Sequence, residues 1–312
     1  MTGDMSRRAV LKGASVAAGA AFGGWALAAG AGTASAATTT VKTARVGASV
    51  TVYAYPAGTT WDKAMADFNA TVGRNFSVAK RYYGAAHTWP KAGGVGPAIQ
   101  TLMDRKCRGL LCFKPARDGS DVDALVSALK AIKNAGLTDV KITLYEEQGL
   151  AQGLTATEFK QVYAAYQPVR QVFPLFVDFS GHAWKTWADY RPAGIDGIAL
   201  DYYANSYVAG SRIDILSQWA SEAGQELGIW EMGNTAYKTV PTPAEISAYF
   251  SYISSVQASR LAKGHRVGDM VWYNGPSGGN YNNTIAGTRL SSLYKLDRKA
   301  LTGLFDKYNG AL

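Results

Sequence analysis

Three glutamates stand where two largely apolar runs end, and they are the residues best placed to do chemistry. Glu146 and Glu147 end the run 142–147, and Glu231 follows the run 227–230. Two carboxyl groups that face one another across a sugar can cleave a glycosidic bond, one as general acid and base and the other as nucleophile. When the anomeric configuration is retained, the two carboxyls lie about 5 to 5.5 Å apart. The glutamates therefore predict acid–base and nucleophilic chemistry.

Short β-rich runs alternate with amphipathic helical stretches along most of the chain. Residues 121–135 are typical of the helices, with apolar residues at helical spacing and Gly136 as a stop signal. Repeated alternation of this kind favours an α/β fold of parallel strands, and eight units close into a (β/α)8 TIM barrel. A doubly wound open sheet is the alternative, although the chain has no Gly-rich dinucleotide fingerprint and no P-loop. The expected strands are 46–53, 77–83, 109–114, 140–145, 175–179, 197–202, 227–230 and 269–273.

In such a barrel the chemistry lies at the carboxyl ends of the strands. The side chains there are mostly polar or aromatic, which suits a sugar, because aromatic faces stack on pyranose rings and carboxylates accept hydrogen bonds from hydroxyls. The fourth and seventh strands lie roughly across the barrel, so glutamates at their ends can face one another. The strand-end residues are Tyr53, Tyr55, Arg81, Tyr83, Lys114, Arg117, Glu146, Glu147, Asp178, His182, Asp201, Tyr203, Glu231, Asn234, Trp272 and Asn274.

Four short motifs resemble those of the retaining (β/α)8 glycoside hydrolases, most nearly the glycoside hydrolase family 26 type, which includes β-mannanases. The motifs are Phe113-Lys114-Pro115, Tyr145-Glu146-Glu147, Asp201-Tyr202-Tyr203 and Trp230-Glu231. The resemblance extends over most of the chain after residue 43. It implies that Glu147 is the general acid and base, because the family places that glutamate second in a polar pair, and that Glu231 is the nucleophile.

Glu146 departs from the family pattern, in which the residue before the acid is usually His or Asn. An extra carboxylate beside the acid would raise the pKa of the acid if it stayed ionised, or would itself be protonated and donate a hydrogen bond. It could also accompany a changed substrate or a lost activity. An exchange of roles between Glu146 and Glu147 stays open, because side chains alternate along a strand.

The remaining site candidates are expected to bind substrate. Asp201 and Tyr203 share a strand face, and the resemblance puts Tyr203 within hydrogen-bond reach of Glu231. His182 precedes two tryptophans and suits hydroxyl recognition, and Trp272 suits ring stacking; the alternatives are a structural histidine and a core tryptophan. The expected substrate-binding residues are Glu146, Asp201, Tyr203, His182, Trp272, Lys114, Tyr83 and Asn234.

The first residues have the organisation of a twin-arginine export signal. Arg7 and Arg8 precede an Ala/Gly-rich apolar stretch, and Ala34-Ser35-Ala36 offers a cleavage site. A membrane anchor is the alternative, but the stretch has few bulky apolar residues and no stop-transfer charges follow it. We expect a signal peptide over 1–36, a linker over 37–43 and a single barrel over 44–312, with the mature protein secreted into the extracellular space.

Composition narrows the partners and cofactors. The formal net charge of +9 is scattered, without the basic stripe of a nucleic-acid-binding protein. Five residues of largely extended chain would place the Cα atoms of Cys107 and Cys112 too far apart for a disulfide, and three separated histidines provide no metal site. We expect a monomer that needs no metal or cofactor and acts on a polysaccharide or oligosaccharide, without stable membrane insertion after signal cleavage.

Three functions fit these residues to different degrees. The first is a secreted retaining glycoside hydrolase that acts on an extracellular polysaccharide, such as a β-mannan or related β-glycan. The second is a non-catalytic carbohydrate-binding barrel at the cell surface, motivated by Glu146 in the His or Asn position. The third is a phosphodiesterase on the same fold, which would want paired active-site histidines that the spacing does not readily supply.

Overall fold

The computed structural model describes residues 44–50, 58–203, 212–233, 243–274 and 292–308. The chain separates into two compact units, Met1–Thr40 and Val41–Leu312, and all the described residues belong to the second. The expected signal peptide over 1–36 and the linker over 37–43 lie outside the described residues.

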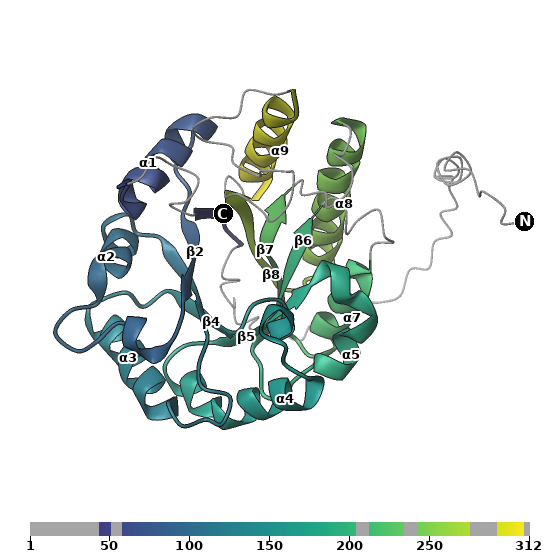
Figure 1. Ribbon diagram of the computed structural model, residues 1–312. Helices are drawn as coiled ribbons and strands as arrows, with labels where there is room; N and C mark the ends of the chain where they lie inside the picture. Colours follow the sequence, from purple (N-terminus) through teal and green to yellow (C-terminus); the bar gives the residue numbers. More distant parts are fainter. Residues whose placement is uncertain (1–43, 51–57, 204–211, 234–242, 275–291, 309–312) are drawn as a thin grey trace, which may run out of the picture. The chain divides into compact units, whose positions relative to one another are not determined.

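The second unit is a closed barrel of parallel strands in sequence order (Figure 1). Strand β1 pairs with β2 on one side and with β8 on the other, where Val46 lies opposite Met270. This pairing confirms the (β/α)8 barrel and excludes the open sheet. The strands are β1 Val46–Val50, β2 Val78–Tyr83, β3 Arg108–Phe113, β4 Val140–Leu144, β5 Leu175–Ser180, β6 Gly197–Tyr203, β7 Glu226–Gly233 and β8 Val267–Asn274.

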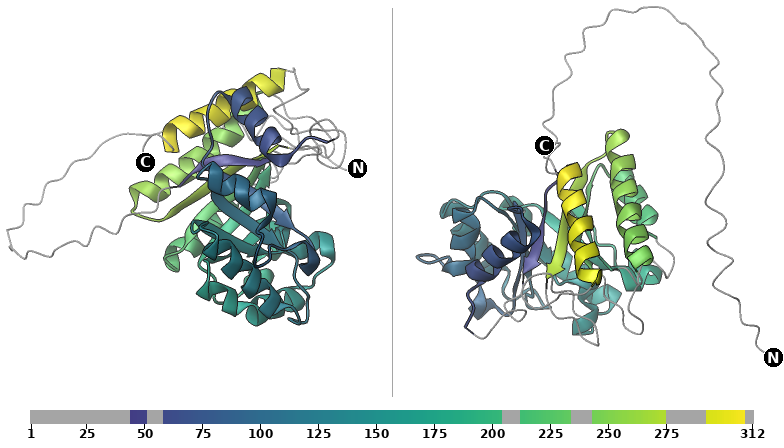
Figure 2. Two further views of the ribbon diagram at one scale, coloured as in Figure 1. Left: turned by 90° about the vertical axis from the view of Figure 1, so that its left-hand side faces the viewer. Right: turned by 90° about the horizontal axis from the view of Figure 1, so that it is seen from above.

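The helices surround the strands, and α9 lies beside α8 (Figures 1 and 2). None of the described helices is both long enough and apolar enough to cross a bilayer. The α-helices are α1 Trp61–Val72, α2 Gly96–Asp104, α3 Val122–Asn134, α4 Ala156–Ala165, α5 Trp187–Tyr190, α7 Ile213–Glu222, α8 Pro243–Ala262 and α9 Ser292–Tyr308. The short 3₁₀ helices are η3 Ala86–Thr88, η4 Glu147–Gln152, η5 Gln167–Gln171 and η6 Gly181–Thr186.

Local sequence signals account for the helix boundaries. Thr155 caps α4: its side chain accepts a hydrogen bond from the Glu158 amide at 3.2 Å, and Glu158 accepts one from the Thr155 amide at 2.8 Å. This reciprocal arrangement satisfies two amides that the helix leaves unpaired. Helix α3 buries Leu125, Leu129 and Ile132, as its apolar spacing predicts.

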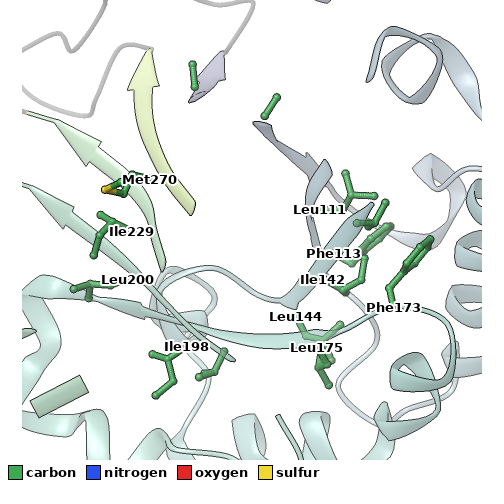
Figure 3. Close-up of a cluster of buried hydrophobic side chains, with 14 of the residues drawn as sticks. Leu111, Phe113, Ile142, Leu144, Phe173, Leu175, Ile198, Leu200, Ile229 and Met270 are labelled. Atoms are coloured by element: carbon green, nitrogen blue, oxygen red, sulfur yellow. The ribbon is translucent and has the colours of Figure 1, made fainter. Parts of the chain in front are cut away.

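The strands present alternate side chains to two separate apolar regions. The outer region lies between strands and helices, and Figure 3 shows part of it, including Leu111, Ile142, Leu200 and Met270. On β6, for example, Ile198 and Leu200 belong to this outer region, whereas Ala199 faces the barrel interior.

The barrel interior is layered. An apolar layer fills its middle, with Val78, Leu110, Phe176, Ala199, Trp230 and Val271. Toward the amino ends of the strands lies a lower ionic cluster of Arg108, Lys141, Glu226 and Asp269, in which Asp269 lies 2.7 Å from both Arg108 and Lys141. Two residues further along β2, β5 and β6 lies an upper ionic cluster of Lys80, Asp178 and Asp201. The apolar layer therefore separates the site at the barrel mouth from the charges at the barrel base.

Candidate active site

A β-bulge directs Glu231 into the barrel. Glu226 and Trp230 face the interior, so simple alternation would turn Glu231 outward. Between β6 and β7 the register shifts: Leu200 lies opposite Ile229, but the next residue, Asp201, lies opposite Glu231. The residue gained on β7 brings Glu231 to the interior beside Asp201, which is a common use of bulges next to functional sites.

Two residues hold the carboxylate of Glu231. The Tyr203 hydroxyl donates a hydrogen bond to Oε2 at 2.6 Å, and the Lys80 ammonium lies 3.4 Å from Oε1. Burial raises the pKa of Glu231, and the positive charge of Lys80 opposes this rise. Tyr203 lies within hydrogen-bond reach of Glu231, as the resemblance implied. The pair of contacts can keep a buried glutamate ionised and correctly oriented.

The backbone after β4 adopts an unusual conformation. Tyr145, Glu147 and Gln148 have positive φ angles of 59°, 49° and 57°, a region that non-glycine residues rarely occupy and that accumulates at functional sites. The buried Gln148 fixes the turn to β5, because its side-chain oxygen accepts a hydrogen bond from the Ser180 amide at 2.9 Å. The conformation places Glu147 at the barrel mouth.

Glu147 has the environment that a general acid needs. It is half-buried, and its Oε1 accepts a hydrogen bond from the Ser180 hydroxyl at 3.0 Å. Burial is the largest cause of its raised pKa; the Ser180 hydrogen bond lowers the pKa, and the charges of Asp178 and Glu146 raise it. A raised pKa keeps a carboxyl protonated closer to neutral pH, where it can donate its proton.

Glu146 forms an ion pair with Lys114, whose ammonium lies 2.9 Å from Glu146 Oε1. Both side chains are partly exposed, at 23% and 33%. The pairing is that of an ionised carboxylate, and the charge of Glu146 contributes to the raised pKa of Glu147.

Both candidate catalytic glutamates influence Asp201 and Tyr203. Burial is the largest cause of the raised pKa values of Asp201 and Tyr203. The negative charge of Glu147 adds a smaller rise to each. Asp201 and Tyr203 also adjoin Glu231 on the β6–β7 side. Asp201 and Tyr203 therefore lie beside Glu231 and within the electrostatic influence of Glu147.

Two expected substrate contacts are corrected by the structure. Trp272 is fully buried and stacks on Phe250 of α8, with ring centroids 5.8 Å apart, so its ring is not available to a sugar. Tyr83 belongs to the outer apolar region and stacks on Phe113 at 5.0 Å. In both cases the neighbouring residue, Tyr273 or Tyr82, has the position expected to face the interior.

The other candidates are placed as follows. His182 is exposed and lies in η6, directly after β5. Asn234 lies outside the described residues. Lys80 contacts Glu231, Ser180 contacts Glu147, and Asp178 contacts Lys80. None of these three was among the expected catalytic or substrate-binding residues. Asp178 was one of the strand-end residues, whereas Lys80 lies mid-strand, and its one signal is a lysine in a largely apolar run.

The described residues contain no group of three or more His, Cys, Asp or Glu side chains arranged to hold a metal ion. The carboxylates of Asp178, Asp201 and Glu231 do converge, but they surround the Lys80 ammonium. Cys107 and Cys112 are both free and buried.

The chain is therefore a (β/α)8 barrel that carries glutamates at its mouth, at the carboxyl ends of β4 and β7. Solved glycoside hydrolases share this fold. The catalytic domain of a family 26 endo-β-1,4-mannanase from Bacillus sp. JAMB-750 is 12% identical, with a TM-score of 0.57 over 85% of this chain and 86% of that chain. An endo-β-1,4-mannanase double mutant from Cellulomonas fimi is 13% identical, with a TM-score of 0.54 over 84% and 71%. A GH5-4 broad-specificity endoglucanase from an uncultured bacterium is 14% identical, with a TM-score of 0.51 over 84% and 95%.

Comparison at the level of sequence finds less. No family model matches the chain, and no curated protein matches it. The structural likeness therefore concerns the fold, and the function must be argued from the site.

Proposed function

We propose that this protein is a retaining glycoside hydrolase. The observation that carries the proposal is the contrast between two glutamates at the barrel mouth. Burial raises the pKa of both, but Glu147 accepts a hydrogen bond from the neutral Ser180 hydroxyl and lies near the charge of Glu146, whereas Glu231 is held by the Lys80 cation and the Tyr203 hydroxyl. A pair of carboxyls whose surroundings differ in this way suits one acid and one nucleophile.

The two glutamates would act in two steps. Glu231 attacks the anomeric carbon while Glu147 protonates the departing glycosidic oxygen, which leaves a glycosyl ester on Glu231. Glu147, now ionised, then takes a proton from water as the water oxygen attacks the anomeric carbon and releases Glu231. Tyr203 holds Glu231 Oε2 during both steps.

For the substrate we propose an extracellular β-glycan, with a β-1,4-mannan as the first to be tested. Two of the structurally similar proteins are endo-β-1,4-mannanases. The twin-arginine motif at Arg7 and Arg8 supports export, and a polysaccharide too large to enter a cell must be met outside it.

The first test is hydrolysis by the mature chain and by single variants. Wild-type protein is incubated with β-mannan, glucomannan, mixed-linkage β-glucan and β-xylan, and new reducing ends are measured. Glu231→Gln should reduce turnover by roughly 10³-fold or more, because it removes the nucleophile. Glu222→Gln, an exposed glutamate on α7, is the matched control and should keep wild-type rates.

The Glu147→Gln variant distinguishes the acid and base from the nucleophile. Added azide should restore turnover of an aryl glycoside with a good leaving group, because azide attacks the glycosyl ester without base assistance. Glu146→Gln tests the exchanged assignment, and azide rescue of this variant in place of Glu147→Gln would assign the acid to Glu146.

The competing function is a non-catalytic carbohydrate-binding barrel, which the Glu146–Lys114 pair favours because it occupies the position beside the acid. Binding of the same polysaccharides to immobilised protein separates the two functions. Binding without new reducing ends from any polymer would support the binding barrel and contradict the hydrolase.

A further inference from the structure

Lys80 connects the proposed nucleophile to two buried aspartates. Its ammonium lies 3.0 Å from Asp178, 3.1 Å from Asp201 and 3.4 Å from Glu231, which come from β5, β6 and β7. A lysine ammonium has three N–H donors, so it can offer one to each carboxylate. Burial alone would lower the pKa of Lys80, but the three carboxylates raise it well above its usual value. Lys80 is therefore a buried, permanently charged group.

Three ionised carboxylates around one buried ammonium would leave two uncompensated negative charges, which is costly away from water. Asp178 Oδ1 is buried without a hydrogen-bond partner among the described residues. Asp178 and Asp201 both contact the Lys80 ammonium, at 3.0 and 3.1 Å, and a hydrogen bond between their side chains is among the causes that act on the pKa of Asp178. Two carboxyl groups can hydrogen-bond only if one carries a proton. A single shared proton would supply the missing partner and remove one of the negative charges.

We propose that Lys80 is a positioning residue for Glu231 and that Asp178 and Asp201 share one proton. With this proton in place, the positive charge of Lys80 is available to stabilise the Glu231 carboxylate. This inference rests on the proposed role of Glu231 as nucleophile. With one proton on the aspartate pair, Lys80 balances the pair when Glu231 is esterified, and it stabilises the carboxylate when Glu231 is free. Lys80 lies 3.4 Å from one oxygen of Glu231, and Tyr203 donates a hydrogen bond to the other.

Lys80 is the cation that acts on Glu231 among the described residues. The other titratable groups that face Glu231 or its partners are acidic, phenolic or thiol side chains. They are Tyr82 of β2, Cys112 of β3, Glu146 and Glu147 after β4, Asp178 of β5, Asp201 and Tyr203 of β6 and Tyr273 of β8. Removal of Lys80 should therefore act on Glu231 without another positive charge to replace it.

The test is a carboxyl titration by NMR on mature protein labelled with [5-13C]glutamate, which needs no substrate. The sequence has seven glutamates, and the Glu231 signal is identified by its loss in Glu231→Gln. Lys80→Met should raise the midpoint of the Glu231 titration by roughly 1 pH unit or more, because it removes an opposite charge close to the carboxylate.

Lys141→Met is the matched control. Lys141 is another buried lysine of the barrel interior, but it contacts Glu226 and Asp269 in the lower ionic cluster, beyond the apolar layer. Its replacement should shift the Glu226 signal and leave the Glu231 midpoint in place. A Glu231 shift in Lys80→Met no larger than in Lys141→Met would overturn the positioning role.

Asp178→Asn tests the shared proton and keeps the cation, so it also carries the test if Lys80→Met does not fold. In this variant a neutral amide lies beside an ionised Asp201, which gives the same charge as an aspartate pair with one proton. The Glu231 midpoint should therefore stay nearly unchanged. A fall in the midpoint by roughly 1 pH unit or more would show that both aspartates were ionised and overturn the shared proton. If no glycan is cleaved, the hydrolase proposal is overturned. The titrations would still test the positions and charges of Lys80, Asp178 and Asp201, because they need no substrate.

Discussion

At the scale of single residues, the two candidate catalytic glutamates have opposite needs. Glu231 must be ionised to attack, and Glu147 must be protonated to donate. Burial raises the pKa of both. Their partners differ, however. Glu231 has a cation and a phenol beside it, whereas Glu147 has a neutral hydroxyl and the negative charge of Glu146 nearby.

The Tyr203 hydroxyl should contribute directly to turnover. Tyr203→Phe removes the hydrogen bond to Glu231 Oε2, and a hydrogen bond to a charged group is worth about 1.5–3 kcal/mol. We expect kcat/KM to fall about 10- to 150-fold. The matched control is Tyr249→Phe, which removes the hydrogen bond to the Tyr202 carbonyl outside the barrel. It should lower the melting temperature and leave kcat/KM near the wild-type value; equal losses of activity would contradict the role of Tyr203.

The Ser180 hydroxyl should set the alkaline limit of activity. Its hydrogen bond to Glu147 favours the ionised carboxylate and so lowers the pKa of Glu147. Ser180→Ala removes this effect, so the pKa of Glu147 rises and the acid stays protonated to higher pH. The alkaline limb of the kcat/KM profile should therefore move to higher pH. A limb that stays in place, or moves to lower pH, would show that Glu147 is not the acid that the profile reports.

At the scale of elements, the bulge in β7 determines whether Glu231 faces the barrel interior. Strand positions could be predicted from the sequence, because apolar runs and helix caps are local signals. The phase of each strand could not, since a one-residue change in register turns every side chain to the other face. Trp272 and Tyr83 were expected to bind substrate, but they pack in the outer apolar region between strands and helices. Lys80 was missed because it lies within a strand and not at its end.

Close packing in the apolar layer should make it sensitive to small additions. A Cβ at Gly228 would lie 2.7 Å from Trp230 Nε1 and 3.1 Å from the Asp269 carbonyl oxygen. Gly228→Ala should reduce the free energy of unfolding by about 1–3 kcal/mol, measured by urea denaturation. Gly303→Ala is the control, since it adds a methyl group to open space in α9 and should stabilise by about 0.5–1 kcal/mol. An unchanged stability in Gly228→Ala would contradict the packing of this layer.

At the scale of the whole molecule, the barrel interior holds more carboxyls than its cations neutralise. Burial is the largest cause of the raised pKa values of Asp178, Asp201, Glu226 and Glu231. The exception is Asp269, where Lys141 and Arg108 outweigh burial and lower the pKa. The closed barrel could be predicted from the alternation of elements, but its two ionic clusters required the register of all eight strands.

The excess of buried carboxyls over buried cations predicts how the stability of the protein changes with pH. Between the ordinary carboxyl pKa of about 4 and the raised values in the folded protein, the folded state holds protons that the unfolded chain has lost. Stability therefore falls as pH rises through this window, and the melting temperature should be higher near pH 5 to 6 than at pH 8. Asp201→Asn should reduce this dependence. A wild-type melting temperature that falls on acidification from pH 8 would contradict the raised pKa values.

The central claim is a double displacement by Glu147 and Glu231, and the stereochemistry of the first product tests it most directly. A β-1,4-mannan oligosaccharide, or whichever β-glycan the hydrolysis assays identify, is mixed with the enzyme and followed by proton NMR before mutarotation. Two displacements at the anomeric carbon predict that the β-anomer appears first and the α-anomer later. Initial appearance of the α-anomer would mean a single displacement by water and would contradict the nucleophilic role of Glu231.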